Sequence, residues 1–232
     1  RFSGEPRQPM LAPPRSDFAQ YDAGFRLGGP ILRDRLWFFA AWNPIREREE
    51  VLIPGQGYYS DLITTQAFAA KLTWQASRKD NLILTIFGDP QRRRGIGDTF
   101  GNFGTPTSFA DPDPFLEKIR RGGINYALNG THQLGARLLL ETRASLLTCQ
   151  ESNQPETERG RAQSLYIDMD GRWSGGSPSR VNARSRVVSG GLALTYAGSR
   201  HLLKGGLEYR DNGLDLDSYA ASITRLGETD WF

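Results

Sequence analysis

The chain has 232 residues, of which 38% are hydrophobic and 24% are charged, and its formal net charge is +3. No stretch approaches the roughly 20 apolar residues that a membrane-spanning helix needs, which excludes a helical inner-membrane protein but leaves a transmembrane β-barrel open. The small charge excess gives no indication of nucleic-acid binding, and the single cysteine, Cys149, excludes an internal disulfide framework.

The first 16 residues include Pro6, Pro9, Pro13 and Pro14, which fix φ and lack a backbone donor. We expect residues 1–16 to form an irregular lead-in, either the end of a plug or a linker. Nothing near Arg1 follows the basic, apolar and small-residue order of a secretory signal. We therefore expect that such a signal has been removed or that the chain is a fragment.

Alternating polarity begins at Tyr21, where apolar side chains at odd positions through Leu27 alternate with small or charged ones. This period of two is typical of a half-buried strand. Gly29 to Arg35 then supply a tight turn, and the same unit recurs three more times. We predict eight strands in four antiparallel hairpins: 21–28 with 36–42, 68–75 with 82–86, 124–129 with 138–148, and 188–196 with 203–210.

The connections alternate in length, with brief turns inside the hairpins and long links between them. The long links are predicted at Pro44–Thr65, Asp89–Lys118, Gln150–Ser185 and from Asp211 onward. Outer-membrane barrels alternate short periplasmic turns with long extracellular loops, whereas repeated long loops are uncommon in compact domains. The pattern predicts an all-β, antiparallel, up-and-down transmembrane barrel section over residues 17–217, followed at 218–232 by a loop or the start of a further strand.

Aromatic side chains lie at the ends of the predicted strands, as in the girdles where hydrocarbon meets lipid headgroups. The core of a soluble β-sandwich is the alternative for the same rings. They are Tyr21, Trp37, Trp42, Trp74, Tyr126, Tyr196 and Tyr209. The second strand is apolar on both faces, with Trp37 and Phe39 alternating with Leu36 and Phe38, so we expect a plug inside a wide barrel to cover it.

Charged side chains occupy the polar positions of several strands and are expected to line the barrel interior. They are Asp22, Arg26, Lys71, Glu141, Arg143, Lys204, Glu208 and Arg210. Interior charges of both signs can pair across strands and hold water or a plug, but nothing in their spacing makes them converge as a catalytic set. Arg92, Arg93 and Arg94 fall in a predicted extracellular loop, where they form either a solvated charge run or a site for an anion such as lipopolysaccharide phosphate.

Motifs for metal or enzyme chemistry are incomplete. Asp168, Asp170 and Gly171 resemble part of a calcium loop without its bidentate glutamate, and the acidic run from Asp211 to Asp217 offers another candidate cation edge. His132 and His201 are the only histidines and both adjoin predicted turns. We therefore predict no enzyme activity, no cofactor and no resident metal.

Three segments resemble Oar-like TonB-dependent receptors, a family that often carries an N-terminal carboxypeptidase-regulatory-like domain. The run GFRLGGPILRDRLWFF, from Gly24 to Phe39, is similar to the segment where the barrel of these receptors begins. Two more resemble the same family, from Lys71 to Leu82 and from Ser199 to Arg210. The resemblance spans Asp17 to about Asp217.

The resemblance implies an outer-membrane transporter of a Gram-negative bacterium, with about 22 strands closed around a plug. Such proteins take up a scarce nutrient, such as an iron chelate, a peptide or a glycan, with energy relayed by TonB. The expected partners are lipid, lipopolysaccharide, TonB through a missing N-terminal region and an unidentified nutrient. Two alternatives remain: a complete eight-stranded barrel with a structural or adhesive role, and a soluble β-sandwich binding module.

Overall fold

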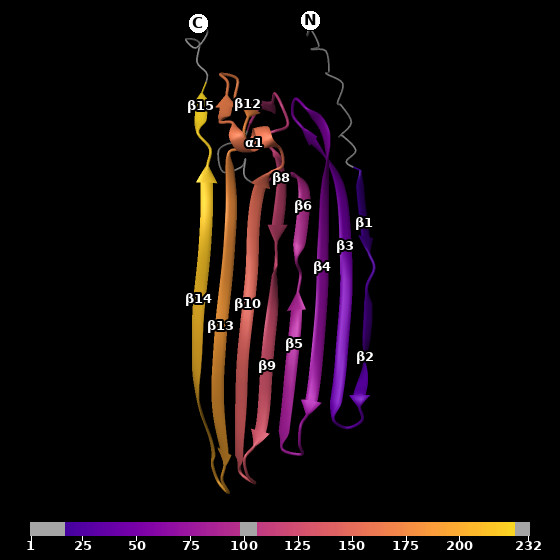
Figure 1. The fold of residues 1–232 in the computed structure, drawn as a ribbon, viewed down its shortest axis with the longest axis vertical. Helices are drawn as coiled ribbons and strands as arrows, with labels where there is room; N and C mark the ends of the chain where they lie inside the picture. Colours follow the sequence, from indigo (N-terminus) through magenta and orange to yellow (C-terminus); the bar gives the residue numbers. More distant parts are fainter. Residues whose placement is uncertain (1–16, 98–105, 226–232) are drawn as a thin grey trace, which may run out of the picture.

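A computed structural model describes residues 17–97 and 106–225, and antiparallel β-structure dominates it. Eleven strands form one sheet whose path runs β1-β3-β4-β5-β9-β10-β13-β14. Figure 1 shows the long strands side by side, with β1 and β2 at one edge and β14 at the other. This arrangement confirms the predicted all-β, up-and-down class.

The eleven strands of the main sheet fill eight positions, because three positions are each shared by two strands in succession. β1 and β2 both pair with β3, β5 and β6 both pair with β4, and β8 and β9 both pair with β10. The strands are β1 Phe18–Asp22, β2 Phe25–Leu32, β3 Leu36–Ile53, β4 Gly57–Gln75, β5 Asp80–Gly88, β6 Gln91–Ile96, β8 Leu116–Arg121, β9 Gly123–Gln133, β10 Leu138–Pro155, β13 Ser179–Ala197 and β14 Leu202–Ala220.

The four predicted hairpins are present, each closed by a short turn at the same end of the sheet (Figure 1). The turns are Arg33–Arg35, Ala76–Lys79, Leu134–Arg137 and Gly198–His201. In the first turn Asp34 has a φ of 60°, a left-handed conformation that aspartate tolerates better than most residues.

At the opposite end, strands occupy much of what the sequence predicted as long loops. Within Pro44–Thr65, β3 and β4 continue in register until a short turn at Pro54–Gln56. Likewise β14 runs on to Ala220, past the expected loop start at Asp211. The alternation of apolar and polar residues stops well before the hydrogen-bonded ladder does, because a ladder needs only a neighbouring strand, whereas apolar alternation needs an apolar environment.

A small subdomain, which we call the cap, forms the same end of the molecule (Figure 1). It contains β7 Ser108–Phe109, α1 Glu158–Ala162, β11 Leu165–Ile167, β12 Arg172–Gly175 and β15 Ile223–Arg225. The four strands form a second sheet in the order β15-β11-β12-β7. The Thr157 hydroxyl accepts a hydrogen bond from the Gly160 amide and so caps the start of α1.

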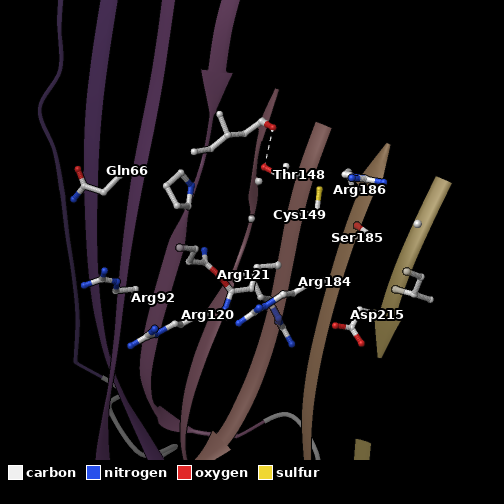
Figure 2. A pocket seen from close by; sticks show the side chains of 18 of the residues that line it. Gln66, Arg92, Arg120, Arg121, Thr148, Cys149, Arg184, Ser185, Arg186 and Asp215 are labelled. Atoms are coloured by element: carbon white, nitrogen blue, oxygen red, sulfur yellow. Dashed lines mark hydrogen bonds between the residues drawn. The ribbon is translucent and has the colours of Figure 1, made fainter. Parts of the chain in front are cut away.

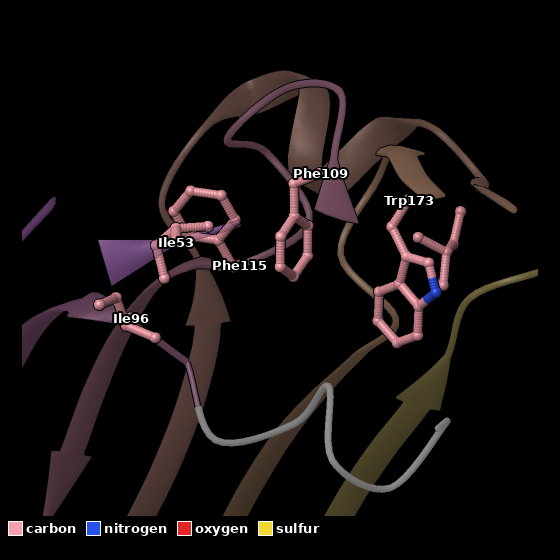
Figure 3. Close-up of a cluster of buried hydrophobic side chains, with 6 residues drawn as sticks. Ile53, Ile96, Phe109, Phe115 and Trp173 are labelled. Carbon is pink, nitrogen blue, oxygen red and sulfur yellow. The ribbon is translucent and has the colours of Figure 1, made fainter. Parts of the chain in front are cut away.

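Buried apolar side chains fix the cap to the main sheet (Figure 3). Phe109 makes edge-to-face ring contacts with Phe115 and Trp173. The same cluster includes Ile53 and Ile96, which come from the tips of β3 and β6. Phe115 is fully buried. This cluster is the apolar core of the part of the chain that the structure describes.

No helix within residues 17–97 and 106–225 has the length and apolar character needed to cross a membrane.

Candidate functional site

The strand register assigns every side chain of the main sheet to one of two faces. Residues paired across an antiparallel ladder lie on the same face, and successive residues of one strand lie on opposite faces. We name the faces after two neighbours in β14, the Leu207 face and the Glu208 face. The cross-strand pairs extend these face assignments, one strand at a time, from β14 through β13 and β10 to β2.

The Leu207 face carries a continuous apolar band. Along β13 it runs from Tyr196 to Val188, about the nine to eleven residues that a membrane-crossing strand needs. Its members include Phe25, Leu27, Phe38, Trp42, Phe68, Leu72, Trp74, Leu82, Leu84, Leu128, Leu140, Leu146, Leu192, Leu194, Leu203 and Leu207. Leu207 is 81% exposed and Leu203 64%. A contiguous exposed apolar surface of this extent is rare in soluble monomers and is typical of an interaction surface or a lipid contact.

The band runs obliquely across the strands while keeping its width. At its lower edge, successive cross-strand pairs connect Leu36 of β3 to Leu207 of β14. Leu207 lies five residues beyond Leu202, the first residue of β14. At its upper edge, cross-strand pairs connect Trp42 to Gly213, four residues past Tyr209, where the apolar run of β14 ends. The two edges shift in the same sense. Strands that tilt relative to an apolar slab produce this offset.

Six of the seven predicted girdle aromatics lie on the Leu207 face: Tyr21, Trp42, Trp74, Tyr126, Tyr196 and Tyr209. At the upper edge the indole N–H of Trp42 donates to Gln66 Oε1 at 2.9 Å, so the ring points its polar atom away from the band. Trp37 is the exception, because it pairs with Thr73 on the Glu208 face. Its assignment to a girdle on the Leu207 face is therefore corrected.

β3 also carries apolar side chains on the Glu208 face, and these form a patch there. Trp37 and Phe39 are 36% and 41% exposed there. A depression of about 760 Å³ lies farther along this face, lined in part by Ala41, Phe87 and Leu147. The patch and the depression are therefore open to a partner or a ligand.

All eight predicted interior charges share the Glu208 face. Asp22 and Arg26 reach it from β1 and β2, Lys71 from β4, and the other five from β10 and β14. Lys204 forms an ion pair with Glu141, and Arg143 Nη2 lies 2.6 Å from Glu208 Oε2. Charges of both signs are therefore mixed on this face.

These two ion pairs cross a strand that lies between the partners. Glu141 and Arg143 belong to β10, and Lys204 and Glu208 belong to β14, with β13 between them. The intervening positions on this face are Ala193 and Gly191. A Cβ at Gly191 would lie 2.7 Å from Arg143 Nε, so the glycine leaves the space through which the arginine reaches its partner.

The arginine run lies in β6 and not in a loop, which corrects the sequence prediction. Alternation within the strand separates the three side chains. Arg93 lies on the Glu208 face, where its Nη2 is 2.7 Å from Oδ2 of the buried Asp61. Arg92 and Arg94 lie on the Leu207 face, and a hydrogen bond to Glu156 raises the pKa of Arg94. The sequence of β6 does not alternate between apolar and polar residues, so it did not predict a strand. β6 forms because it pairs with its neighbours β4 and β8.

The cap covers the end of the Glu208 face and leaves the Leu207 face open. In β8 the Glu208-face residues Glu117 and Ile119 are buried, whereas Lys118 and Arg120 on the other face are exposed. The Ser177 hydroxyl of the cap donates to Glu117 Oε1 at 3.3 Å. The sequence patterns did not predict the cap, although the apolar residues Phe109, Phe115 and Trp173 within the predicted loops were a usable signal.

The predicted cation candidates serve other roles or remain apart. Asp168 Oδ1 accepts hydrogen bonds from the amides of Asp170 and Arg172, so it closes the turn between β11 and β12. Asp211, Asp215 and Asp217 line the Leu207 face of β14. Within the described ranges, no three His, Cys, Asp or Glu side chains are grouped so that they would hold a metal ion.

Comparison with known proteins links this geometry to outer-membrane transport proteins. No family model matches the chain. The TonB-dependent transporter Oar of Myxococcus xanthus is 31% identical over 104 aligned residues, and the match covers 33% of this chain and 10% of Oar. The outer membrane transporter YddB of Escherichia coli superposes with a TM-score of 0.61 and 12% identity, over 90% of this chain and 28% of YddB.

The chain therefore spans about a tenth of the curated relative and about a quarter of the solved structure. At 12% identity the likeness to YddB concerns the fold alone. The chain is an all-β, antiparallel section of the kind found in an outer-membrane transporter, and a third of it is similar in sequence to a TonB-dependent transporter.

Proposed function

We propose that this chain forms part of the barrel wall of an Oar-like TonB-dependent transporter in the outer membrane of a Gram-negative bacterium. The observation that carries the proposal is the exposed apolar band of the Leu207 face, backed by charges of both signs on the Glu208 face. A soluble sandwich would bury such a band against a second sheet. In the proposal, lipid covers the Leu207 face and the Glu208 face lines the lumen.

In this orientation the tight turns lie in the periplasm and the cap lies at the extracellular mouth. The cap folds over the Glu208 face, so it would cover the entrance to the lumen. The patch formed by Trp37 and Phe39 would contact a plug or an incoming nutrient such as an iron chelate, a peptide or a glycan. The wall would span residues 17–217, and TonB would act through an N-terminal region of the protein.

The edges of the sheet are consistent with one section of a larger wall. Among the described residues, β14 pairs only with β13 along the main sheet. An unpaired edge in hydrocarbon leaves backbone groups without partners at a cost of several kcal/mol each. Further strands would pair with β14 and with β1 and β2, as expected if the chain is part of a longer barrel.

Site-directed spin labels test the orientation of the wall. Single cysteines at Leu203, Lys204, Leu207 and Glu208 would be labelled in a Cys149→Ser background, with the protein that carries this chain reconstituted in liposomes. Accessibility to oxygen, which concentrates in lipid, should be high at 203 and 207, and accessibility to a water-soluble nickel chelate should be high at 204 and 208. Equal accessibility to both reagents at all four positions would rule out the barrel wall.

Gene deletions test the transport proposal. A strain lacking the gene is compared with a strain lacking tonB and with the double deletion, using growth on limiting iron chelates, peptides and glycans. For one nutrient class we expect the two single deletions to lower uptake equally and the double deletion to add nothing. Uptake that depends on the gene but not on tonB would refute a TonB-dependent role.

A further inference from the structure

Just beyond the apolar band, the Leu207 face becomes basic. The residues come from three strands: Arg92 and Arg94 in β6, Lys118 and Arg120 in β8, and Arg184 and Arg186 in β13. Four of the six, Lys118, Arg120, Arg184 and Arg186, flank β10, which contributes the uncharged Gln150 and Ser152 between them on this face. The basic surface is thus built by strand register and is not a run of adjacent residues in the chain.

Two pairs of like charges lie directly opposite each other in this surface. Arg92 is opposite Arg120, and Arg94 is opposite Lys118. Cβ atoms of such pairs are about 4.5 to 5.5 Å apart, and opposed like charges destabilise a sheet. Glu156 compensates Arg94. Among the described residues, however, no ion pair or hydrogen bond involves the side chains of Arg92, Arg120 or Arg184.

Besides Glu156 at Arg94, the acidic groups near the basic surface lie on its β14 side. Asp211 Oδ2 lies 3.8 Å from Arg186 Nη2, and Asp215 is the cross-strand neighbour of Arg184, both from β14. Toward β6 and β8 no carboxylate of a described residue forms an ion pair with Arg92 or Arg120. Figure 2 shows Arg92, Arg120 and Arg184 reaching into the same region from β6, β8 and β13, beside a depression of about 890 Å³.

The height of these arginines corresponds to the headgroup region of a membrane. Arg92 is opposite Thr64, four residues along β4 from Phe68 at the edge of the band, and Arg186 is two residues along β13 from Val188. At about 3.3 Å per residue and a strand tilt of about 40°, these offsets are roughly 5 to 10 Å above the hydrocarbon. Headgroup phosphates lie in this layer.

We propose that Arg92, Arg120 and Arg184 bind the phosphate groups of a bis-phosphorylated glycolipid of the outer leaflet, of the lipid A type. The inference rests on the proposed function, because the Leu207 face must contact lipid. A phosphate between Arg92 and Arg120 removes their repulsion and accepts charge-assisted hydrogen bonds from both guanidinium groups. Arg184, across β10, takes the second phosphate while the acyl chains lie on Leu146, Val188 and Ile124.

A lipid source explains the position of the site better than a soluble anion. The three arginines are exposed on the side of the sheet that carries the apolar band, whereas the cap encloses the other face at this height. An amphiphile gains from both parts of this surface, the basic part through its phosphates and the apolar band through its chains. A free phosphate would use only the first.

The test measures binding of synthetic lipid A to the protein that carries this chain, purified in a neutral detergent, by native mass spectrometry. The probes are bis-phosphorylated lipid A, its dephosphorylated form and inorganic phosphate. The variant is Arg92→Gln, Arg120→Gln and Arg184→Gln combined. The control combines Arg33→Gln, Arg35→Gln and Arg78→Gln, which removes the same charge from exposed turns at the other end of the sheet.

We expect the wild type and the control to bind bis-phosphorylated lipid A at least about tenfold more tightly than the triple variant does. The dephosphorylated lipid should bind the wild type and the variant equally. Equal binding of bis-phosphorylated lipid A to the wild type and variant, or equal weakening in the control, would overturn the site. Tight binding of inorganic phosphate at the same arginines would overturn the lipid as its source.

Failure of the site and failure of the proposed function remain distinguishable. If the spin labels at positions 203 and 207 report lipid while the arginine variant binds normally, only the site is wrong. If those labels report water, the wall proposal fails and the lipid site fails with it.

Discussion

At the residue scale, ion pairs of very different energetic weight occur on neighbouring strands. Arg93 and Asp61 form a buried pair in which the Asp61 side chain is 3% exposed, whereas Arg48 and Glu50 pair with 59% and 34% exposure. Removing one partner of a buried pair leaves the other charge without a partner in the protein interior, where water does not solvate it. An exposed pair is screened by water, so its loss costs less. Identical chemistry therefore makes unequal contributions to stability.

We predict that Asp61→Ala lowers the free energy of unfolding by about 3 kcal/mol, because the Arg93 guanidinium loses its buried carboxylate. The matched control, Glu50→Ala, should cost less than about 1 kcal/mol. Equilibrium denaturation of the purified protein in detergent measures both values. Similar losses in the two variants would show that burial of the Asp61 pair has no energetic consequence.

At the element scale, β13 acts as a spacer between two charged strands. Its small residues Gly191 and Ala193 let side chains of β10 and β14 meet above it. Gly190, the neighbour of Gly191 on the opposite face, has open space around its Cβ position, with one atom at 3.8 Å. A larger side chain would therefore meet Arg143 at position 191 but open space at position 190. The same substitution at the two positions tests this difference.

Gly191→Val should lower the free energy of unfolding by less than about 1 kcal/mol, because the new side chain displaces Arg143 from its solvent-exposed pair with Glu208. Gly190→Val, which adds an apolar side chain to the Leu207 face, should be neutral or stabilising. Denaturation midpoints measure both. In an Arg143→Ala background, most of the loss of stability caused by Gly191→Val should disappear. If the loss remained in that background, the valine would be clashing with the backbone and not with the Arg143 side chain.

At the scale of the whole molecule, the cap and the main sheet share one apolar cluster but expose different surfaces. Ile53 and Ile96 belong to the tips of long strands, and Phe115 and Trp173 belong to the cap and its approach. The stability of the cap therefore depends on a few large side chains, whereas that of the sheet depends on its ladders. Local opening of the cap without loss of the sheet is the expected consequence.

Phe115→Ala should leave a cavity worth about 3 to 5 kcal/mol and loosen the cap selectively. Hydrogen exchange measured by mass spectrometry should then accelerate in α1, β11 and β12, while β13 and β14 between Val188 and Tyr209 remain protected. The control is Met169→Ala in the turn between β11 and β12, where the side chain is 64% exposed. Uniform acceleration throughout the sheet would show that the cap and sheet unfold as one unit.

The sequence by itself determined the alternating strands, the four tight turns and the charges that share one face, because period-two alternation and turn chemistry are local properties. Asp22, Lys71 and Glu208 are far apart in the chain, yet the immediate neighbours of each predict a polar strand face, and the register places all three on one face of the sheet. The apolar alternation of the Leu207 face ends at residues such as Val188 and Tyr209, and beyond them the sequence no longer predicts strands.

Only the tertiary structure decided what lies beyond that point. The ladders continue through polar residues because neighbouring strands supply their hydrogen-bond partners, so β6 forms from three arginines that no propensity favours. Register then sets Arg92 opposite Arg120, 28 positions later in the chain. Such pairings depend on long-range strand order, which a periodic pattern does not encode.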